Sequence, residues 1–220
     1  MQFFLDSADV GEIAYGLEHW DIAGVTTNPR HVQASGKPFL RVIREIARLV
    51  EGTEKTVSVE VSPHLHDWEA MVAEGERLAA LSPNFVVKIH CVEAAFRAVR
   101  ELAARGIRTN VTLIFSATQG LQAMRSGAFY ISPFIGWKEA NAEETRGFIS
   151  DLVAMRANFR FPTRVLVAAV RNGRQIADAA VAGADIVTCG FAVYKEAFDH
   201  PYTRDGLARF QSFWDKTPFE

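Results

Sequence analysis

The sequence predicts a (β/α)8 barrel, also called a TIM barrel, formed by a single domain with an additional C-terminal helix. Three observations support this prediction: the length of the chain, its alternation of short apolar runs with segments of helical period, and the number of those repeats. The 220 residues, 49% of them hydrophobic, can bury one large core and suit a one-domain α/β barrel. We expect residues 1–220 to form this domain, because no linker, low-complexity segment or charge block interrupts them.

Eight short apolar runs, rich in β-branched and aromatic residues, have the pattern of buried strands. They span residues 2–6, 22–26, 56–61, 84–88, 109–113, 128–132, 164–168 and 185–188. Helical segments separate the runs, which is typical of parallel strands joined by crossover helices. Eight strands favour a closed barrel over an open doubly wound sheet, and the chain has no G-x-G-x-x-G or Walker sequence.

Segments with apolar residues at helical spacing follow the strands. They span residues 8–17, 39–50, 67–80, 92–104, 117–125, 142–158, 173–182 and 191–198. Gly106, Gly127 and Gly183 stand between a helix and the next strand, where glycine readily adopts the positive φ that ends a helix. A last amphipathic segment at 204–214 is the expected additional C-terminal helix.

Charge and cysteine content exclude several classes of protein. The 24 basic and 26 acidic residues give a net charge of −2 and form no basic stripe, so we expect neither a nucleic acid nor a membrane as partner. No signal-peptide pattern or bilayer-length apolar run occurs. Cys91 and Cys189 stand far apart, outside any C-x-x-C motif, which favours two buried thiols in a cytoplasmic protein.

Polar residues stand at the ends of several apolar strands. Asp6, Glu60, Lys88 and Thr112 each complete or nearly complete such a run. In a (β/α)8 barrel the carboxyl ends of the strands build the active site, so these four residues are predicted to be catalytic. For any one of them alone, solvent exposure or a structural salt bridge is the favoured explanation. Their occurrence on four strands favours a site.

A lysine at this depth suggests a particular chemistry. Burial favours the neutral, nucleophilic form of a lysine amine, and such an amine can attack a ketone to form a Schiff base. Glu60 with Thr112 can then position a water, while Asp6 exchanges a proton with a substrate hydroxyl. This chemistry needs no metal or organic cofactor. The His64-x-His66 pair has no third ligand at a recognisable spacing, so we predict no metal site.

Six motifs carry a resemblance to a known family: Phe-Leu-Asp (4–6), Gly-Val-Thr-Thr-Asn-Pro (24–29), Val-Val-Lys-Ile (86–89), Asn-Val-Thr-Leu-Ile-Phe-Ser (110–116), Ile-Ser-Pro-Phe-Ile-Gly (131–136) and Arg-Asn (171–172). In order and spacing they resemble the transaldolase and fructose-6-phosphate aldolase family. The resemblance implies that Lys88 forms the Schiff base, that Asp6 acts on the hydroxyl of the cleaved bond, and that Glu60 and Thr112 hold the catalytic water. It also implies substrate contacts from Thr26, Thr27, Asn28, Asn110, Ser132 and Phe134, and a homo-oligomer, often assembled through the C-terminal helix.

Two positions separate the branches of that family. The aldolase branch typically has glutamine at position 60 and tyrosine at position 134, whereas transaldolases have glutamate and phenylalanine. Glu60 and Phe134 therefore imply a transferase, which moves a dihydroxyacetone unit from a small-molecule ketose to an aldehyde.

Departures from the family pattern bear on the substrate. Sugar-phosphate enzymes of the family usually carry arginine where this chain has Trp137, and serine where it has Ala169. The candidates to bind an anionic group instead are Arg30, Lys138, Arg171, Asn172 and Arg174, with Trp137 in the pocket. Arg30 as a solvated loop residue and Trp137 as a packing residue are alternatives.

Three runs, at 26–31, 132–139 and 169–175, resemble sulfofructose transaldolases of sulfoquinovose breakdown. This implies 6-deoxy-6-sulfofructose as ketose, with release of sulfolactaldehyde and an acceptor such as glyceraldehyde 3-phosphate. A sugar-phosphate transaldolase, a fructose-6-phosphate aldolase and a non-catalytic sugar-binding barrel stay open as alternatives.

Overall fold

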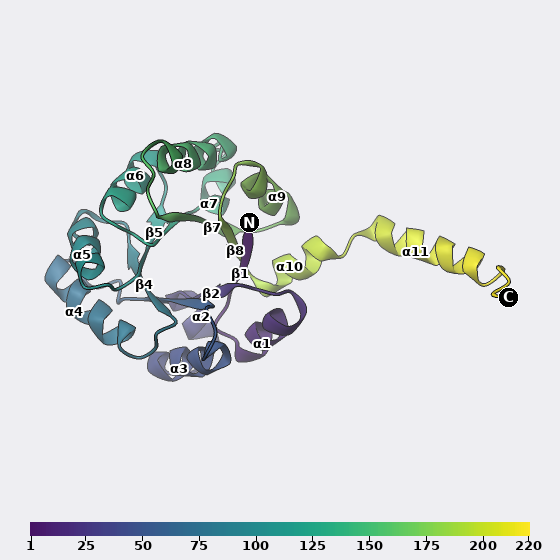
Figure 1. Ribbon diagram of the computed structural model, residues 1–220, viewed down its shortest axis with the longest axis horizontal. Helices are drawn as coiled ribbons and strands as arrows, with labels where there is room; N and C mark the ends of the chain where they lie inside the picture. The colour runs from purple at the N-terminus through teal and green to yellow at the C-terminus, as the bar shows by residue number, and fades with distance from the viewer.

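A closed barrel of eight parallel strands forms the centre of the protein and confirms the predicted fold class (Figure 1). The computed structural model describes residues 1–220. The strands pair in chain order, and the eighth closes onto the first. They are β1 (Gln2–Asp6), β2 (Gly24–Thr26), β3 (Thr56–Glu60), β4 (Phe85–His90), β5 (Thr109–Ile114), β6 (Tyr130–Pro133), β7 (Arg164–Val170) and β8 (Ile186–Cys189).

Helices surround the barrel as an outer ring (Figure 1). They are α1 (Val10–His19), α3 (Phe39–Val50), α4 (Trp68–Ala79), α5 (Glu93–Ala104), α6 (Ala117–Arg125), α8 (Arg146–Asn158), α9 (Gly173–Val181) and α10 (Phe191–Phe198). Two short helices, α2 (Pro29–Ala34) and α7 (Gly136–Ala140), were not predicted. Neither is long enough to show a periodic apolar face. The helix expected at 142–158 begins only at Arg146, because α7 and a turn occupy the residues before it.

The apolar core has two parts. The larger part lies between the strands and the helix ring and includes Leu5, Val87 and Leu102. The smaller part lies inside the barrel, where Phe4 and Tyr130 meet edge to face with ring centroids 5.9 Å apart. Because strand side chains alternate in direction, β1, β4, β6, β7 and β8 supply residues to both parts.

Polar side chains replace the apolar ones toward the carboxyl ends of the strands. The Asn110 amide donates to Ser58 Oγ at 3.0 Å, and Ser132 Oγ donates to the Asn110 carbonyl oxygen at 2.8 Å. All three residues are buried, and these bonds offset the cost of burying them. The barrel interior therefore becomes polar toward the carboxyl ends of the strands, below the loops that carry α2 and α7.

Two β-bulges interrupt the strands at this polar end. The register shifts between Val111 and Ile114 in β5 and between Val167 and Val170 in β7. Leu113 and Ala169 have φ angles of 59° and 57° there, a conformation that is costly for residues with a side chain. A bulge changes the direction in which the side chains of a strand point. Consecutive residues at the two bulges, Thr112–Leu113 and Ala168–Val170, line one pocket.

The C-terminal helix α11 (Pro201–Trp214) projects away from the barrel (Figure 1). None of its residues is buried, although Phe210, Phe213 and Trp214 are large and apolar. The apolar face of this helix is therefore not covered by any other part of the chain. No helix of the protein combines the length and apolarity that a transmembrane span needs.

Gly24 provides a test of the packing inside the barrel. A Cβ at this position would lie 2.5 Å from the Phe4 ring and 2.7 Å from the Thr56 carbonyl oxygen. We expect Gly24→Ala to lower the free energy of unfolding by about 1–3 kcal/mol, as overpacking does, in a denaturant titration. The matched control is Gly206→Ala, because a Cβ on Gly206 meets open space; equal effects of the two substitutions would refute the proposed tight contact.

Candidate active site

A pocket of about 580 Å³ opens at the polar end of the barrel. It is formed where strands end and βα-loops begin, which is the face that carries the active site in (β/α)8 barrels. Its size is in the range of small-molecule sites. The predicted residues that line it are Asp6, Thr26, Asn28, Arg30, Glu60, Lys88, Thr112, Ser132, Phe134, Trp137 and Arg171.

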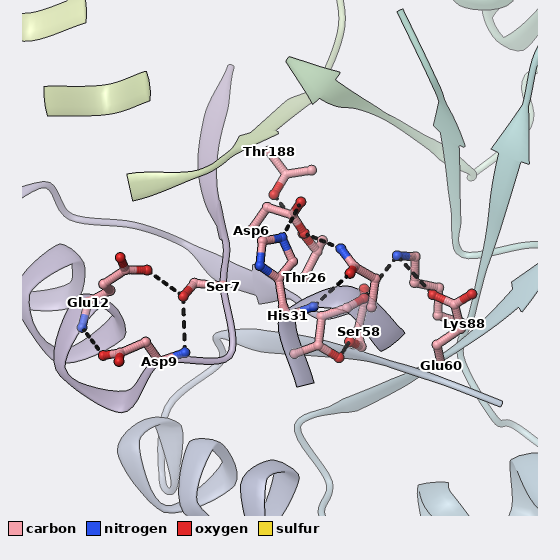
Figure 2. A network of polar contacts seen from close by, with 12 residues as sticks. Asp6, Ser7, Asp9, Glu12, Thr26, His31, Ser58, Glu60, Lys88 and Thr188 are labelled. Atoms are coloured by element: carbon pink, nitrogen blue, oxygen red, sulfur yellow. Dashed lines mark hydrogen bonds and ion pairs between the residues drawn. The ribbon is translucent and has the colours of Figure 1, made fainter. Parts of the chain in front are cut away.

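Lys88 lies at the bottom of this pocket, with only 5% of its side chain exposed. It projects inward from β4 next to Glu60 on β3, because the register pairs these two residues. The ammonium nitrogen is 3.2 Å from Glu60 Oε2 and donates to the Thr27 carbonyl oxygen at 2.9 Å (Figure 2). The buried charge is therefore paired and hydrogen-bonded, as a buried ammonium must be.

Thr112 contributes a hydroxyl group without a partner in the protein. Its Oγ1 atom is buried and makes no hydrogen bond, although the residue lines the pocket. A buried polar atom that lacks a partner is costly and rare in folded proteins. The hydroxyl can both donate and accept, so it can serve a water or a substrate oxygen next to Lys88 and Glu60.

Asp6, at the end of β1, accepts hydrogen bonds on both carboxylate oxygens (Figure 2). Thr26 Oγ1 donates to Oδ1 at 2.7 Å, and His31 Nε2 lies 3.0 Å from Oδ2. Burial by itself raises the pKa of Asp6, but the His31 hydrogen bond and the nearby positive charge of Lys88 outweigh it and leave the pKa below its ordinary value. The carboxylate is therefore charged at neutral pH and ready to accept a proton.

The Thr-Thr-Asn-Pro-Arg-His run shapes one wall of the pocket. Asn28 is the N-cap of α2: its side-chain oxygen accepts from the backbone N–H of His31 at 3.1 Å, and Pro29 occupies the first helical position. The Asn28 amide also lies 3.5 Å from Asp6 Oδ1. Because the cap fixes the first turn of α2, Arg30 and His31 are held along the pocket.

The pocket also combines two cations, Arg30 and Arg171, with aromatic rings. Trp137 stacks on Phe115 and meets Phe134 edge to face, with centroids 5.7 and 5.8 Å apart. The two acidic groups of the pocket have other partners: Glu60 pairs with Lys88, and Asp6 is hydrogen-bonded to His31. Arg30 and Arg171 therefore have no acidic partner there. Two guanidinium groups without counter-charges beside an exposed indole can bind an anion.

Four predicted substrate contacts lie outside the pocket lining. Lys138 forms an ion pair with Glu143, and the Asn172 side chain caps α9 by accepting from Gln175 N at 2.9 Å. Asn110 is enclosed by Ser58 and Ser132 below the pocket. The Thr27 hydroxyl donates to Ser58 O at 2.8 Å. Thr27 contacts the site with its backbone carbonyl instead, which accepts a hydrogen bond from Lys88.

Two polar residues of the pocket escaped the sequence analysis, His31 and Thr188. Thr188 Oγ1 lies 2.7 Å from Thr26 Oγ1 and extends the hydrogen-bonded chain that ends on Asp6. The rule of polar residues at strand ends would have found Thr188, because it follows an apolar run on β8. His31 gave no such signal, since it belongs to the short helix that the sequence did not predict.

A larger pocket, about 740 Å³, lies at the opposite end of the barrel. Lys55 and Arg108 line it, but their side chains donate to the backbone carbonyls of Ile22 and Pro83. These cations are already hydrogen-bonded within the protein, and the predicted catalytic side chains lie at the other end of the barrel. The smaller pocket is therefore the candidate active site.

Comparison with known proteins identifies the family of the chain. The family model described as "Transaldolase/Fructose-6-phosphate aldolase" matches residues 3–218. A 6-deoxy-6-sulfo-D-fructose transaldolase from Priestia aryabhattai is 52% identical, covering 100% of this chain and 98% of that protein. A "Probable transaldolase" from Caulobacter sp. (strain K31) is 45% identical, over 99% and 98%. Thiamine phosphate pyrophosphorylase from Pyrococcus furiosus shares the fold alone, with a TM-score of 0.63 and 11% identity over 89% of this chain and 93% of that one.

The two cysteines near the barrel are expected to be unreactive. Burial raises the pKa of Cys91 to about 11 and that of Cys189 to about 12, and only the thiolate reacts with alkylating agents. We expect iodoacetamide at pH 8 to leave both thiols of the native protein unmodified and to label both after unfolding in guanidinium, as read by intact mass. Rapid labelling of native Cys91 would contradict this assignment.

Proposed function

The chain belongs to the transaldolase/fructose-6-phosphate aldolase family and is an enzyme of the transaldolase type, and on that premise we propose that it transfers dihydroxyacetone from 6-deoxy-6-sulfofructose to an aldehyde. One observation carries the proposal: the buried Lys88–Glu60 pair opens into a pocket that also holds Asp6 and the two unpaired cations Arg30 and Arg171. The sulfosugar named for the relative from Priestia aryabhattai supports the choice of ketose.

The reaction begins at Lys88. Its amine, once a proton has left it, attacks the C2 ketone and gives a carbinolamine, which loses water to form an iminium. Glu60, 3.2 Å from the nitrogen, is placed to take up and return protons during this dehydration. The unpartnered Thr112 hydroxyl can hold the departing water against Glu60. The iminium then serves as the electron sink for bond cleavage.

Cleavage of the C3–C4 bond follows. Asp6 takes the proton from the C4 hydroxyl, the bonding electrons flow into the iminium, and an enamine of dihydroxyacetone stays on Lys88 while the aldehyde leaves. The charged state of Asp6, favoured by its hydrogen bonds, suits it to act as the base. With a sulfosugar the released aldehyde is sulfolactaldehyde.

The second half reverses these steps with another aldehyde. The enamine attacks the acceptor carbonyl, Asp6 returns its proton to the new hydroxyl, and water releases the ketose from Lys88. Glu60 and Phe134, the pair that resembles transaldolases, support transfer over release of free dihydroxyacetone. Glyceraldehyde 3-phosphate and erythrose 4-phosphate are the proposed acceptors, and the sulfosugar places the enzyme in sulfoquinovose breakdown.

The anionic group of the ketose is proposed to bind between Arg30 and Arg171. A sulfonate offers three oxygens to their donors with a single charge. The backbone of Arg171 is fixed because its N–H donates to Gln175 Oε1 at 2.6 Å, and Gln175 in turn donates to Glu139 of α7. Trp137, also on α7, closes the pocket next to the sulfonate. Lys138 and Asn172 have other partners and are left out of this binding site.

The enzyme is proposed to work as a homo-oligomer in the cytoplasm. Helix α11 extends from the barrel with Phe210, Phe213 and Trp214 exposed, and large exposed apolar groups of this kind favour association. A second copy of the chain is the proposed partner of this helix.

Removal of the nucleophile tests the mechanism. Borohydride reduces an iminium to a stable amine, so wild-type protein incubated with 6-deoxy-6-sulfofructose should gain a dihydroxyacetone adduct on Lys88. We expect Lys88→Ala to give no adduct by peptide mass spectrometry, and Lys195→Ala, which removes an exposed lysine, to give the wild-type amount. An adduct that persists in Lys88→Ala would refute the assignment.

Substitutions on the anion side test the substrate. Trp137→Arg combined with Ala169→Ser restores the residues usual in sugar-phosphate enzymes, and a phosphate dianion gains more from a third cation than a sulfonate does. We expect kcat/KM for fructose 6-phosphate, relative to 6-deoxy-6-sulfofructose, to rise about tenfold, a change of about 1.4 kcal/mol. Phe159→Arg, at an exposed aromatic residue outside the pocket, is the control. An unchanged ratio would refute this account of the pocket.

A further inference from the structure

His31 contacts the carboxylate that the mechanism uses as its base, although it was not among the predicted site residues. Its Nε2 atom lies 3.0 Å from Asp6 Oδ2, with about a quarter of each side chain exposed (Figure 2). Both residues line the pocket. We infer that His31 is a positioning residue, which acts through Asp6 by holding its Oδ2 atom for proton exchange with the C4 hydroxyl; this rests on the proposed function.

The direction of the hydrogen bond follows from the charge of Asp6. A carboxylate can only accept hydrogen bonds, and Asp6 is charged at neutral pH because its pKa is low. His31 Nε2 therefore carries the hydrogen and donates. The cap of α2 fixes the backbone from which the ring extends, because the backbone N–H of His31 donates to the Asn28 side chain at 3.1 Å.

The partners of Asp6 indicate which of its oxygens reacts. Oδ1 accepts from the Thr26 hydroxyl at 2.7 Å and has the Asn28 amide at 3.5 Å. Oδ2 has only His31. Each carboxylate oxygen has two acceptor sites, so Oδ2 retains one for the substrate hydroxyl. The reacting oxygen is then the one that His31 holds.

This contact suits both halves of a transfer reaction. During cleavage Asp6 must be a carboxylate that accepts the C4 proton, and a donor on Oδ2 stabilises that form. Once Asp6 is protonated, the charge-assisted bond to His31 weakens, which favours return of the proton to the oxygen of the acceptor aldehyde. The same hydrogen bond therefore makes Asp6 available as a base and then as an acid.

Other charged groups also act on Asp6, so the contribution of His31 must be separated from theirs. Lys88 on β4 favours the charged carboxylate. Arg30 on α2 and Arg171 after β7 face the same pocket with positive charge, and Glu60 on β3 faces it with negative charge. All four remain in place when only His31 is changed.

The experiment compares His31→Leu, which removes the donor, with His31→Gln, whose amide can retain it. His66→Leu, at an exposed loop histidine, controls for loss of any imidazole, and thermal unfolding confirms that each variant folds. The first readout is a carboxyl ¹³C NMR titration of Asp6, which requires no turnover. We expect the pKa of Asp6 to rise by about one unit in His31→Leu and to stay near the wild-type value in His31→Gln and His66→Leu.

The second readout is kcat and KM for cleavage of 6-deoxy-6-sulfofructose at neutral pH, where Asp6 is charged in every variant. Since His31 acts on the cleavage step through Asp6, its loss should lower kcat and leave KM near the wild-type value. We expect kcat to be at least about tenfold lower in His31→Leu. Borohydride trapping of added dihydroxyacetone on Lys88 should stay unchanged, because it breaks no carbon–carbon bond.

The outcomes distinguish the inference from the proposed function. An Asp6 titration in His31→Leu identical to wild type would overturn the role of His31. A slower reaction accompanied by an equal loss of dihydroxyacetone trapping on Lys88 would also overturn it, since a general disturbance of the pocket predicts that result. Failure of wild-type Lys88 to form any adduct would instead overturn the proposed function, while the NMR titration would still report on the Asp6–His31 contact.

Discussion

The site depends on one constraint, the burial of the Lys88 ammonium group inside the barrel. A charge in that position is tolerated only with a counter-ion and a full set of hydrogen bonds. Glu60 supplies the counter-ion at 3.2 Å, and the carbonyl oxygen of Thr27 supplies an acceptor at 2.9 Å. These groups come from β3 and from the end of β2, so the register of three neighbouring strands must be correct. A slip of one residue would turn Glu60 out of the barrel.

The loops then convert this buried pair into a site. The Asn28 cap and Pro29 start α2, which brings Arg30 and His31 to the pocket. On the other side, the bulge at Ala169 places its carbonyl oxygen where a Cβ on residue 136 would be only 2.1 Å away, so Gly136 permits the close approach of α7 and β7. Trp137 follows directly. Short helices in the loops thus position the residues proposed to determine substrate specificity. The strands position the residues proposed to take part in the reaction.

The sequence predicted the strands and their inward polar residues well, because burial imposes strong patterns on them. Asp6, Glu60, Lys88 and Thr112 were selected as residues at the ends of apolar runs, and the structure brings all four to one pocket. The same rule was not applied to the last strand, so Thr188 was missed. Side-chain partners were harder to foresee, since the ion pair of Lys138 with Glu143 depends on how the α7 segment folds back on itself.

The contact of His31 with Asp6 could not be predicted from the hydrophobic pattern of the sequence. Its contact with Asp6 joins residues from a strand and from a six-residue helix, and such a helix leaves no periodic signal. That the exposed residue Arg30 lines the pocket likewise became visible only in the coordinates. Contacts between loops depend on local caps and bulges. The sequence does not show which side chains these features bring together in the closed barrel.

The most direct test of the central claim is an NMR time course of 6-deoxy-6-sulfofructose with the enzyme, with and without glyceraldehyde 3-phosphate. The account predicts one equivalent of sulfolactaldehyde per active site without the acceptor and continuous turnover with it, because the dihydroxyacetone unit stays on Lys88 until an aldehyde accepts it. Continuous release of free dihydroxyacetone without an acceptor would make the enzyme an aldolase, and no cleavage of the sulfosugar in either case would contradict the proposed substrate.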